Sequence, residues 1–301
     1  MMNEILVSIS CITYNHSAYI RQCLDGMLMQ QTTFGFEILI HDDCSTDGTD
    51  DIIREYVSRY PQIIKPLFEE ENQYQQGKPI GTIVWNLPRA KGKYIAMCEG
   101  DDYWTDPLKL QKQVDFMEAN PEYSMCFHGA EIKNETDTKI ITTCQDIEDK
   151  EYFTNDIFPG WVVPTASVVY RRLMVNSYPK LTNTKWMYYG DIVLFLKCTH
   201  TGRVWGMKEK MSIYRMTYTG AVISAQYDPK VIEKQCNHYR FLMMNFPQLD
   251  KKWPSEYIAK YHYTMFRQTK GVLNKLKALC MAVRFSPKIV LQKFTSALKR
   301  V

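Results

Sequence analysis

The sequence predicts an α/β fold: a Rossmann-like, mostly parallel sheet with flanking helices, followed by a helical C-terminal appendage. Two observations lead to this class. Strand-like and helix-like patterns alternate through residues 1–120, and beyond residue 228 the chain reads as helices alone. Strands that alternate with helices of this length form βαβ units and a doubly wound sheet. We therefore expect one body over residues 1–225 and a separate helical region over 226–301.

The strands and helices of the first half can be assigned in order. Strands are expected where short apolar runs occur, and helices where apolar residues recur at helical spacing. The expected strands cover residues 5–12, 36–40, 63–68 and 93–98, and the expected helices cover 17–28, 49–60, 80–91 and 106–117. Pro88 should kink the third helix. Asp106 followed by Pro107 is a start signal for the fourth.

The composition is that of an ordinary globular protein, with 45% hydrophobic and 23% charged residues. The nine cysteines are odd in number and form no C-x-x-C pair, which indicates free thiols in a reducing compartment. The first ten residues lack the features of a secretory signal. No apolar run approaches the ~18 residues that a membrane span needs. The expected location is the cytoplasm.

Acidic residues gather where two of the expected strands end. Asp42 and Asp43 follow the second strand, and Glu99, Asp101 and Asp102 follow the fourth. Ligands of doubly wound sheets bind outside the carboxyl ends of the strands. Carboxylates that are crowded together repel one another unless a cation or hydrogen-bond donors satisfy them, and hard oxygen ligands suit Mg²⁺ or Mn²⁺. A metal site is expected at this edge of the sheet.

Four ordered blocks of sequence carry a resemblance to a known family. They are VSISCITYN at 7–15, EILIHDDCSTDGT at 37–49, A-x-G-x-Y-I at 90–95, and EGDDYW with D-P-L-x-L at 99–110. In this order and spacing the chain resembles the family 2 glycosyltransferases, inverting enzymes of the GT-A fold. The resemblance implies a nucleotide-binding half at 1–120 and an acceptor half at 121–225. It also implies transfer of a sugar from a UDP- or GDP-linked donor to an acceptor hydroxyl, in bacterial surface polysaccharide synthesis.

The resemblance also implies roles for individual residues. Glu99, Asp101 and Asp102 stand where the family has its Asp-x-Asp metal motif, so they are the expected ligands of Mn²⁺ or Mg²⁺. Glu99 departs from the family at the first acid, which makes the other two the safer ligands. The expected donor-contacting residues are Thr13, Tyr14, Asn15, Asp42, Asp43, Arg89, Asp101, Trp104 and Arg215.

The expected catalytic base is Asp191. The family places an acid at the start of a helix in its second half, and Asp191 opens the helix expected over 191–201. An N-cap role is the alternative, and the two roles can coexist. Thr217 stands where these enzymes often carry a histidine.

The C-terminal region is strongly basic. Residues 257–301 contain ten Lys or Arg and no Asp or Glu, although the whole chain carries a net charge of only +4. A solvated helix face and an anionic partner are both open interpretations. Among anionic partners a membrane surface is favoured, because basic amphipathic helices lie in the interface plane. No nucleic-acid motif is present. This would place the protein at the inner face of the cell membrane, with a glycan or lipid-linked glycan as acceptor.

Two rival functions remain open at this point. A sugar nucleotidyltransferase shares the layered fold and Mg²⁺, but it normally opens with a glycine-rich phosphate loop, and residues 13–16 contain no glycine. A sugar-nucleotide-binding domain that has lost catalysis is the second rival, and the departures at Glu99 and Thr217 keep it open.

Overall fold

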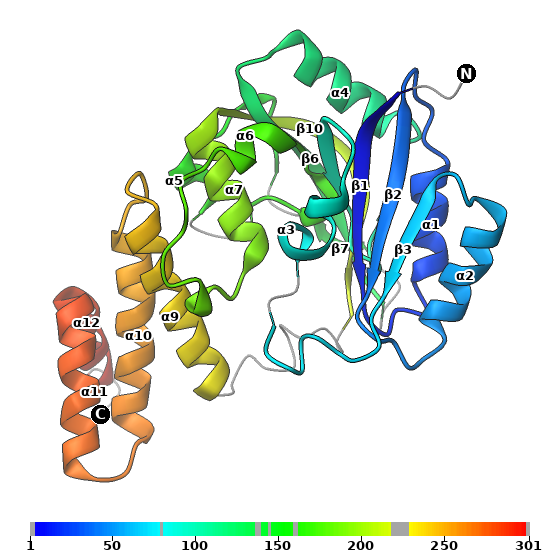
Figure 1. The fold of residues 1–301 in the computed structure, drawn as a ribbon. Coiled ribbons are helices and arrows are strands. Elements are labelled where there is room, and N and C mark those ends of the chain that lie inside the picture. Colours follow the sequence, from blue (N-terminus) through cyan, green and yellow to red (C-terminus); the bar gives the residue numbers. More distant parts are fainter. Residues whose placement is uncertain are drawn as a thin grey trace. The chain divides into compact units, whose positions relative to one another are not determined.

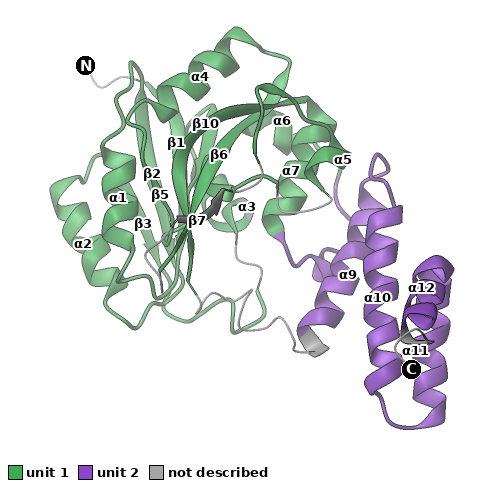
Figure 2. Ribbon diagram, turned by 180° about the vertical axis from the view of Figure 1, so that it is seen from behind, with its two compact units in different colours: residues 1–179, 190–220 green, residues 180–189, 221–301 purple. Residues whose placement is uncertain are grey.

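The computed structural model describes residues 4–78, 81–135, 140–143, 146–158, 162–217 and 229–298. The chain divides into two compact units (Figure 2). The first contains residues 1–179 and 190–220, and the second contains residues 180–189 and 221–301. The short segment 180–189 thus belongs with the C-terminal helices, an association that no local sequence pattern predicts.

The first unit is built on one mixed sheet, seen in Figure 1. Among the described strands the order is β3-β2-β1-β4-β9-β6-β10-β5, with β7 beside β6 and β8 beside β10. The strands are β1 Ile5–Thr13, β2 Gly35–Asp42, β3 Ile64–Phe68, β4 Tyr94–Met97, β5 Tyr103–Trp104, β6 Tyr123–Asn134, β7 Ile140–Thr143, β8 Lys150–Glu151, β9 Val169–Arg171 and β10 Arg203–Met216.

Strands β1 to β4 pair with one another in parallel, as predicted. β1 pairs in parallel with β2 and with β4, and β2 pairs in parallel with β3. β9 then runs antiparallel to both β4 and β6, while β6 and β10 are again parallel. β5 is a short antiparallel partner of β10. The carboxyl ends of β1, β2 and β4 therefore share one edge, and β10 brings the second half of the chain to the residues that follow β4.

Helices cover both faces of this sheet (Figure 1). One apolar cluster joins the sheet to α1, α2 and α4, and the other joins it to α6, α7 and a 3₁₀ turn, η1. The helical elements of the first unit are α1 Ile20–Leu28, α2 Thr49–Arg59, α3 Thr82–Trp85, η1 Leu87–Arg89, α4 Lys109–Ala119, α5 Thr154–Ile157, η2 Thr165–Ser167, α6 Arg172–Asn176 and α7 Gly190–Thr201. The fold class predicted from the sequence is confirmed.

Two predicted helices differ from those observed. The helix expected over 80–91 is broken into α3 and η1, with Pro88 inside the second piece. The helix expected from Asp106 begins only at Lys109. The Asp106 carboxylate accepts a hydrogen bond from the Leu108 N–H at 2.8 Å, so it closes a turn ahead of the helix rather than capping it.

The second unit is helical. Its elements are η3 Thr184–Trp186, α9 Pro229–Asn245, α10 Lys252–Gln268, α11 Val272–Phe285 and α12 Pro287–Leu298. A small core of Tyr263, Ala282 and Val290 joins α10, α11 and α12. The segment 180–189 is tied to α9 because the buried His238 Nδ1 accepts the Tyr188 N–H at 3.2 Å. None of the described helices combines the length and the apolar character that crossing a bilayer would require.

Candidate functional site

Three loops meet at the carboxyl edge of β1, β2 and β4. The Asp43 N–H donates to the Thr13 carbonyl at 3.1 Å, and the Gly100 N–H donates to the Ile12 carbonyl at 2.9 Å. A Cβ added at Gly100 would lie 2.6 Å from Thr13 Oγ1 and 2.9 Å from His16 Nδ1. Glycine is therefore required at position 100, because the acidic loop after β4 lies directly against the loop after β1.

The loop after β1 is held in a fixed shape by the loop after β2. Asn15 adopts a left-handed backbone conformation with φ of 54°. Its N–H donates to Ser45 Oγ at 2.9 Å, and its Oδ1 accepts the Thr46 N–H at 2.8 Å. The Tyr14 side chain, 36% exposed, is left on the surface beside this contact. Asn15 thus shapes the loop that presents Tyr14.

Asp42 and Asp43 are both buried, and each carboxylate accepts hydrogen bonds from residues of a loop. Asp42 accepts hydrogen bonds from the N–H and the hydroxyl of Ser45, at 3.1 and 2.5 Å, and burial raises its pKa. Asp43 accepts the N–H groups of Gln73 and Tyr74, at 2.7 and 3.1 Å. Asp43 therefore fixes the loop that carries Tyr74, whose side chain is 45% exposed.

Asp102 is the most constrained acid of the cluster. It is 1% exposed, and its Oδ1 accepts the backbone N–H of Arg215 at 2.9 Å. Its Oδ2 is buried and has no hydrogen-bond partner in the described part of the chain. Burial raises the pKa of Asp102 well above its usual range, and the charges of Asp101 and Glu99 add to the effect. A buried carboxylate oxygen without a donor is costly, and a cation would relieve that cost.

Glu99 and Asp191 influence each other electrostatically although they are far apart in the sequence. Burial raises the pKa of Glu99 to about 8, and the negative charges of Asp101 and Asp191 contribute. Asp191 lies in the first turn of α7 and is half-buried. Burial also raises its pKa, against the backbone N–H groups of Asp191 and Ile192, which lower it. The predicted base and the predicted metal ligands therefore occupy one electrostatic environment.

Arg215 is the cation inside this cluster. It is 3% exposed, its Nη1 donates to the Asp101 carbonyl at 2.6 Å, and its Nε donates to Glu135 Oε1 at 2.8 Å. Its Nη2 donates to Gln22 Oε1. The Tyr103 ring lies 4.4 Å below the guanidinium carbon. Arg215 thus anchors the acidic loop, while its charge is shared with Glu135.

Sequence reasoning missed three of these residues. His16 links two loops, since its Nδ1 lies 3.2 Å from Thr13 Oγ1 and its Nε2 lies 3.8 Å from Asp101 Oδ2. Its position one residue after the first matching block was the available signal. Gln22 and Glu135, the side-chain partners of Arg215, gave no signal because they are brought there by the fold alone.

Comparison with known proteins identifies the family. Residues 8–181, more than half of the chain, match the family model described as Glycosyl transferase family 2. The chain belongs to glycosyl transferase family 2.

Curated relatives of this family 2 protein extend across bacteria. A Mycobacterium tuberculosis protein is 36% identical over 224 residues, which are 74% of this chain and 62% of the relative. The chain therefore spans less than two thirds of that relative's length. An Escherichia coli protein named UDP-Glc:alpha-D-GlcNAc-diphosphoundecaprenol beta-1,3-glucosyltransferase is 39% identical over 113 residues, 38% of this chain and 41% of its own.

Solved structures show the same fold. Staphylococcus aureus TarS in complex with UDP-GlcNAc aligns with a TM-score of 0.63 at 18% identity, over 93% of this chain and 81% of that one. A Pyrobaculum calidifontis mannosyltransferase in complex with GDP-Man and Mn²⁺ aligns with a TM-score of 0.52 at 14% identity, over 100% of this chain and 81% of that one. The family 2 chain therefore has the GT-A fold.

Two expected donor contacts have packing roles in this family 2 chain. Trp104 is 1% exposed, its indole N–H donates to the Ala166 carbonyl at 2.8 Å, and Lys109 Nζ covers its ring at 4.1 Å. Arg89 donates to the carbonyls of Lys65 and Ile40 at 2.8 and 2.7 Å. Trp104 is a core residue with no open ring face for a sugar, and Arg89 braces β2 against β3.

The expected ligands do not form a complete metal cage on their own. In the described ranges no group of three or more His, Cys, Asp or Glu side chains is arranged to hold an ion. Mg²⁺ and similar ions usually take only one or two carboxylates and complete their coordination with substrate phosphates. The unpartnered Asp102 Oδ2 and the neighbouring Asp101 fit that incomplete kind of site.

Proposed function

We propose that this chain transfers a sugar from a nucleotide-diphosphate sugar to an acceptor hydroxyl, with inversion and with Mn²⁺ or Mg²⁺ as cofactor. The observation that carries the proposal is the buried Asp102 at the carboxyl edge of the sheet, whose Oδ2 has no hydrogen-bond partner among the described residues and whose negative charge is joined by those of Asp101 and Glu99. Neighbouring buried acids destabilise the folded chain unless they bind something cationic or take up protons. A donor diphosphate with its metal ion meets that requirement.

The donor nucleotide is proposed to lie across the loops after β1 and β2. Thr13 and Asn15 hold the first loop in place, and Asp42 and Asp43 hold the loops beside it. Tyr14 then offers a partly exposed ring to a base or ribose. Relatives in fold are solved with UDP-GlcNAc and GDP-Man, which supports a UDP- or GDP-linked donor.

Asp101 and Asp102 are the proposed metal ligands, with Glu99 acting through water. When bound, the ion would neutralise the charge that develops on the departing nucleotide diphosphate, an effect worth several kcal/mol. The Arg215 backbone N–H orients Asp102 through Oδ1 and leaves Oδ2 free to coordinate. The glutamate is placed outside the primary set because position 99 is where the chain departs from the family's Asp-x-Asp motif.

Asp191 is the proposed general base. Its raised pKa makes it a better proton acceptor than an ordinary aspartate once it is ionised, and the α7 N-terminus holds one face of the carboxylate. It would take the proton from the acceptor hydroxyl as that oxygen attacks the sugar. Attack on the side opposite the leaving diphosphate gives inversion.

The proposed acceptor is a glycan or lipid-linked glycan of surface polysaccharide synthesis, and the proposed transferred group is a hexose. The named activity of the E. coli relative, a glucosyltransferase acting on a diphosphoundecaprenol-linked sugar, supports this class.

A donor screen tests the proposal. The chain is incubated with UDP- and GDP-sugars and Mn²⁺, and release of nucleoside diphosphate is measured with and without acceptor glycans. One or more donors should release nucleoside diphosphate, faster with acceptor. Release of pyrophosphate from a nucleoside triphosphate and a sugar 1-phosphate, without any donor consumption, would make the chain a nucleotidyltransferase instead.

A further inference from the structure

Helix α11 presents an apolar face to the outside. Its exposed apolar side chains recur at helical spacing on one side: Val272 is 76% exposed, Leu273 67%, Leu276 52% and Val283 42%, and the exposed Cys280 lies among them. A helix that only packs on a core shows the reverse, with its apolar residues turned inward. We call these five side chains the α11 stripe.

The α11 stripe is bordered by cations on both sides. In a helical projection at 3.6 residues per turn, Lys275 lies on one border, and Lys277 and Arg284 lie on the other. All three side chains are exposed. On α12, Lys288 is likewise an exposed cation and Leu291 is an exposed apolar side chain (66% exposed).

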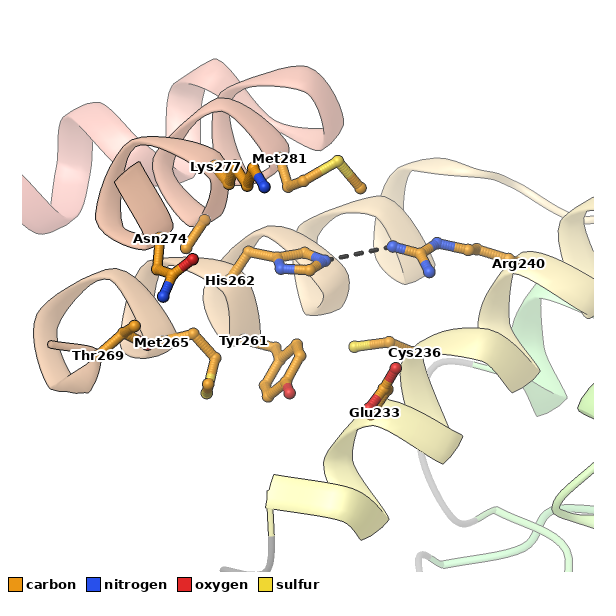
Figure 3. A pocket seen from close by; sticks show the side chains of 11 residues that line it. Glu233, Cys236, Arg240, Tyr261, His262, Met265, Thr269, Asn274, Lys277 and Met281 are labelled. Carbon is orange, nitrogen blue, oxygen red and sulfur yellow. Dashed lines mark hydrogen bonds between the residues drawn. The ribbon is translucent and has the colours of Figure 1, made fainter. Parts of the chain in front are cut away.

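The opposite face of α11 is already occupied within the second unit. Asn274 and Met281 line a cavity of about 300 Å³ together with residues of α9 and α10 (Figure 3), and Lys277 lies at its edge, on the border with the α11 stripe. There Arg240 Nη2 lies 3.2 Å from His262 Nε2. Ala282 is fully buried in the small core with Tyr263. The helix therefore has a packed face for its own unit and a separate apolar face that the unit does not use.

Charge identifies the occupant of this second face. Residues 257–301 contain no carboxylate side chain to compete for the ten Lys and Arg residues or to repel an anion. An apolar stripe with flanking cations matches the interface between lipid headgroups and acyl chains, where the cations reach the headgroups and the apolar side chains enter the acyl boundary. A second copy that paired through the same region would bring no carboxylates to these cations, because residues 257–301 contain none.

We propose that α11, with the start of α12, docks the chain on an anionic lipid bilayer by lying in its interface plane. Sedimentation of the full chain with phosphatidylcholine vesicles, with and without phosphatidylglycerol, tests this. The chain should sediment with the anionic vesicles at low salt, and binding should weaken as salt rises, because Debye screening shortens the reach of the cations. Equal and negligible binding to both vesicle types overturns the proposal.

Matched variants separate apolar insertion from general charge. Lys275→Gln with Lys277→Gln should weaken binding roughly 30-fold, since each basic residue near the surface contributes about a fivefold factor. Leu273→Ser with Leu276→Ser should weaken it about tenfold or more. The controls are Lys91→Gln with Lys208→Gln and Leu173→Ser, exposed positions of the first unit, and these should bind as wild type does.

Other outcomes contradict the proposal. Vesicle binding that is insensitive to the paired serine changes would show attraction without insertion. Stripe variants that convert a dimer to a monomer by light scattering, with no vesicle binding by the wild type, would assign the stripe to a second copy. Salt-sensitive binding to RNA or DNA without binding to vesicles would assign the cations to nucleic acid. Circular dichroism confirms that each variant is folded, and nucleoside diphosphate release from a soluble donor checks the first unit independently.

Discussion

At the residue scale, the site consists of neighbouring carboxylates around Arg215, whose guanidinium is shared with Glu135. Asp102 receives a backbone N–H from Arg215, and Glu99 feels the negative charges of Asp101 and Asp191. The one buried guanidinium among them directs its Nε to Glu135. An external cation would therefore offset the negative charge of this site. Replacing one of its acids with a neutral residue should lower activity but leave stability unchanged or raise it.

Substitution of Asp102 tests this opposition. Asp102→Asn keeps an oxygen for the Arg215 N–H but removes a charge, so turnover should fall roughly 10³-fold or more. The thermal midpoint should stay unchanged or rise, because like-charge repulsion is relieved. Asp106→Asn is the control, since the Asp106 carboxylate is already paired with Lys112 at 2.8 Å. Wild-type turnover in this variant would contradict a metal-binding role, and a lowered thermal midpoint would contradict the relief of charge repulsion.

Substitution of Asp191 distinguishes a catalytic base from a helix cap. If Asp191 takes a proton from the acceptor, Asp191→Asn should lower kcat roughly 10²-fold or more with donor affinity intact. Asn caps helices about as well as Asp, so a purely structural residue would tolerate the change. Steady-state kinetics with saturating acceptor provide the readout, and a silent variant would move the base elsewhere.

The acidic residues that follow β2 and β4 were predictable from sequence because each lies within a recognisable block, whereas the proposed base, Asp191, comes from the family resemblance. The contacts that surround these residues in the folded chain were not predictable from sequence. Trp104 adjoins the acids in sequence, but β5 pairs with β10 and turns its ring into the core. Glu135 meets Arg215 because parallel pairing of β6 with β10 brings residues 80 apart side by side. Long-range pairing of this kind leaves no local pattern to read.

At the element scale, the observed ends of helices and strands match the predicted ends where local sequence signals set them and no long-range contact overrides those signals. The first strands and α2 lie close to their predicted ranges because apolar runs and Pro61 set their limits. Segment 180–189 is the contrasting case. Its association with α9 rests on tertiary hydrogen bonds, including the Tyr188 N–H donated to His238 and the Thr182 N–H donated to Asn245 Oδ1 at 2.8 Å.

The His238 contact predicts an acid-sensitive second unit. Burial lowers the pKa of His238 to about 3, whereas a histidine in the unfolded chain titrates near 6.5. Between these values the unfolded chain binds the proton and the folded chain does not, so the free energy of unfolding falls as pH drops from about 6.5 to 3. His238→Asn, which can still accept the Tyr188 N–H, should flatten this dependence in urea titrations. An unchanged slope would contradict it.

At the scale of the whole molecule, each unit has its own core. Two clusters on the sheet faces belong to the first unit, and Tyr263, Ala282 and Val290 centre the second. The sequence pointed to such a division through the basic, acid-free stretch after residue 256. It could not show that segment 180–189 crosses the division, because that assignment depends on tertiary contacts.

Independent cores predict separable unfolding. Tyr263→Ala should destabilise the second unit by about 3–5 kcal/mol, the usual cost of removing a buried aromatic ring. Hydrogen exchange should then speed up in α10 to α12, while the first unit keeps its protection. Phe195→Ala, a buried aromatic of the first unit, should do the reverse. Simultaneous loss of protection in both units for both variants would show a single cooperative domain.

The central claim is that the acidic edge of the sheet binds a nucleotide diphosphate together with a divalent cation. Calorimetric titration of the full chain with UDP and with GDP, in Mn²⁺ and in excess chelator, tests it most directly. We predict that at least one nucleotide binds in Mn²⁺ and binds at least about tenfold more weakly in chelator, with Asp102→Asn resembling the chelated protein. Equal affinity in Mn²⁺ and in chelator, or no binding of either nucleotide, would contradict the account.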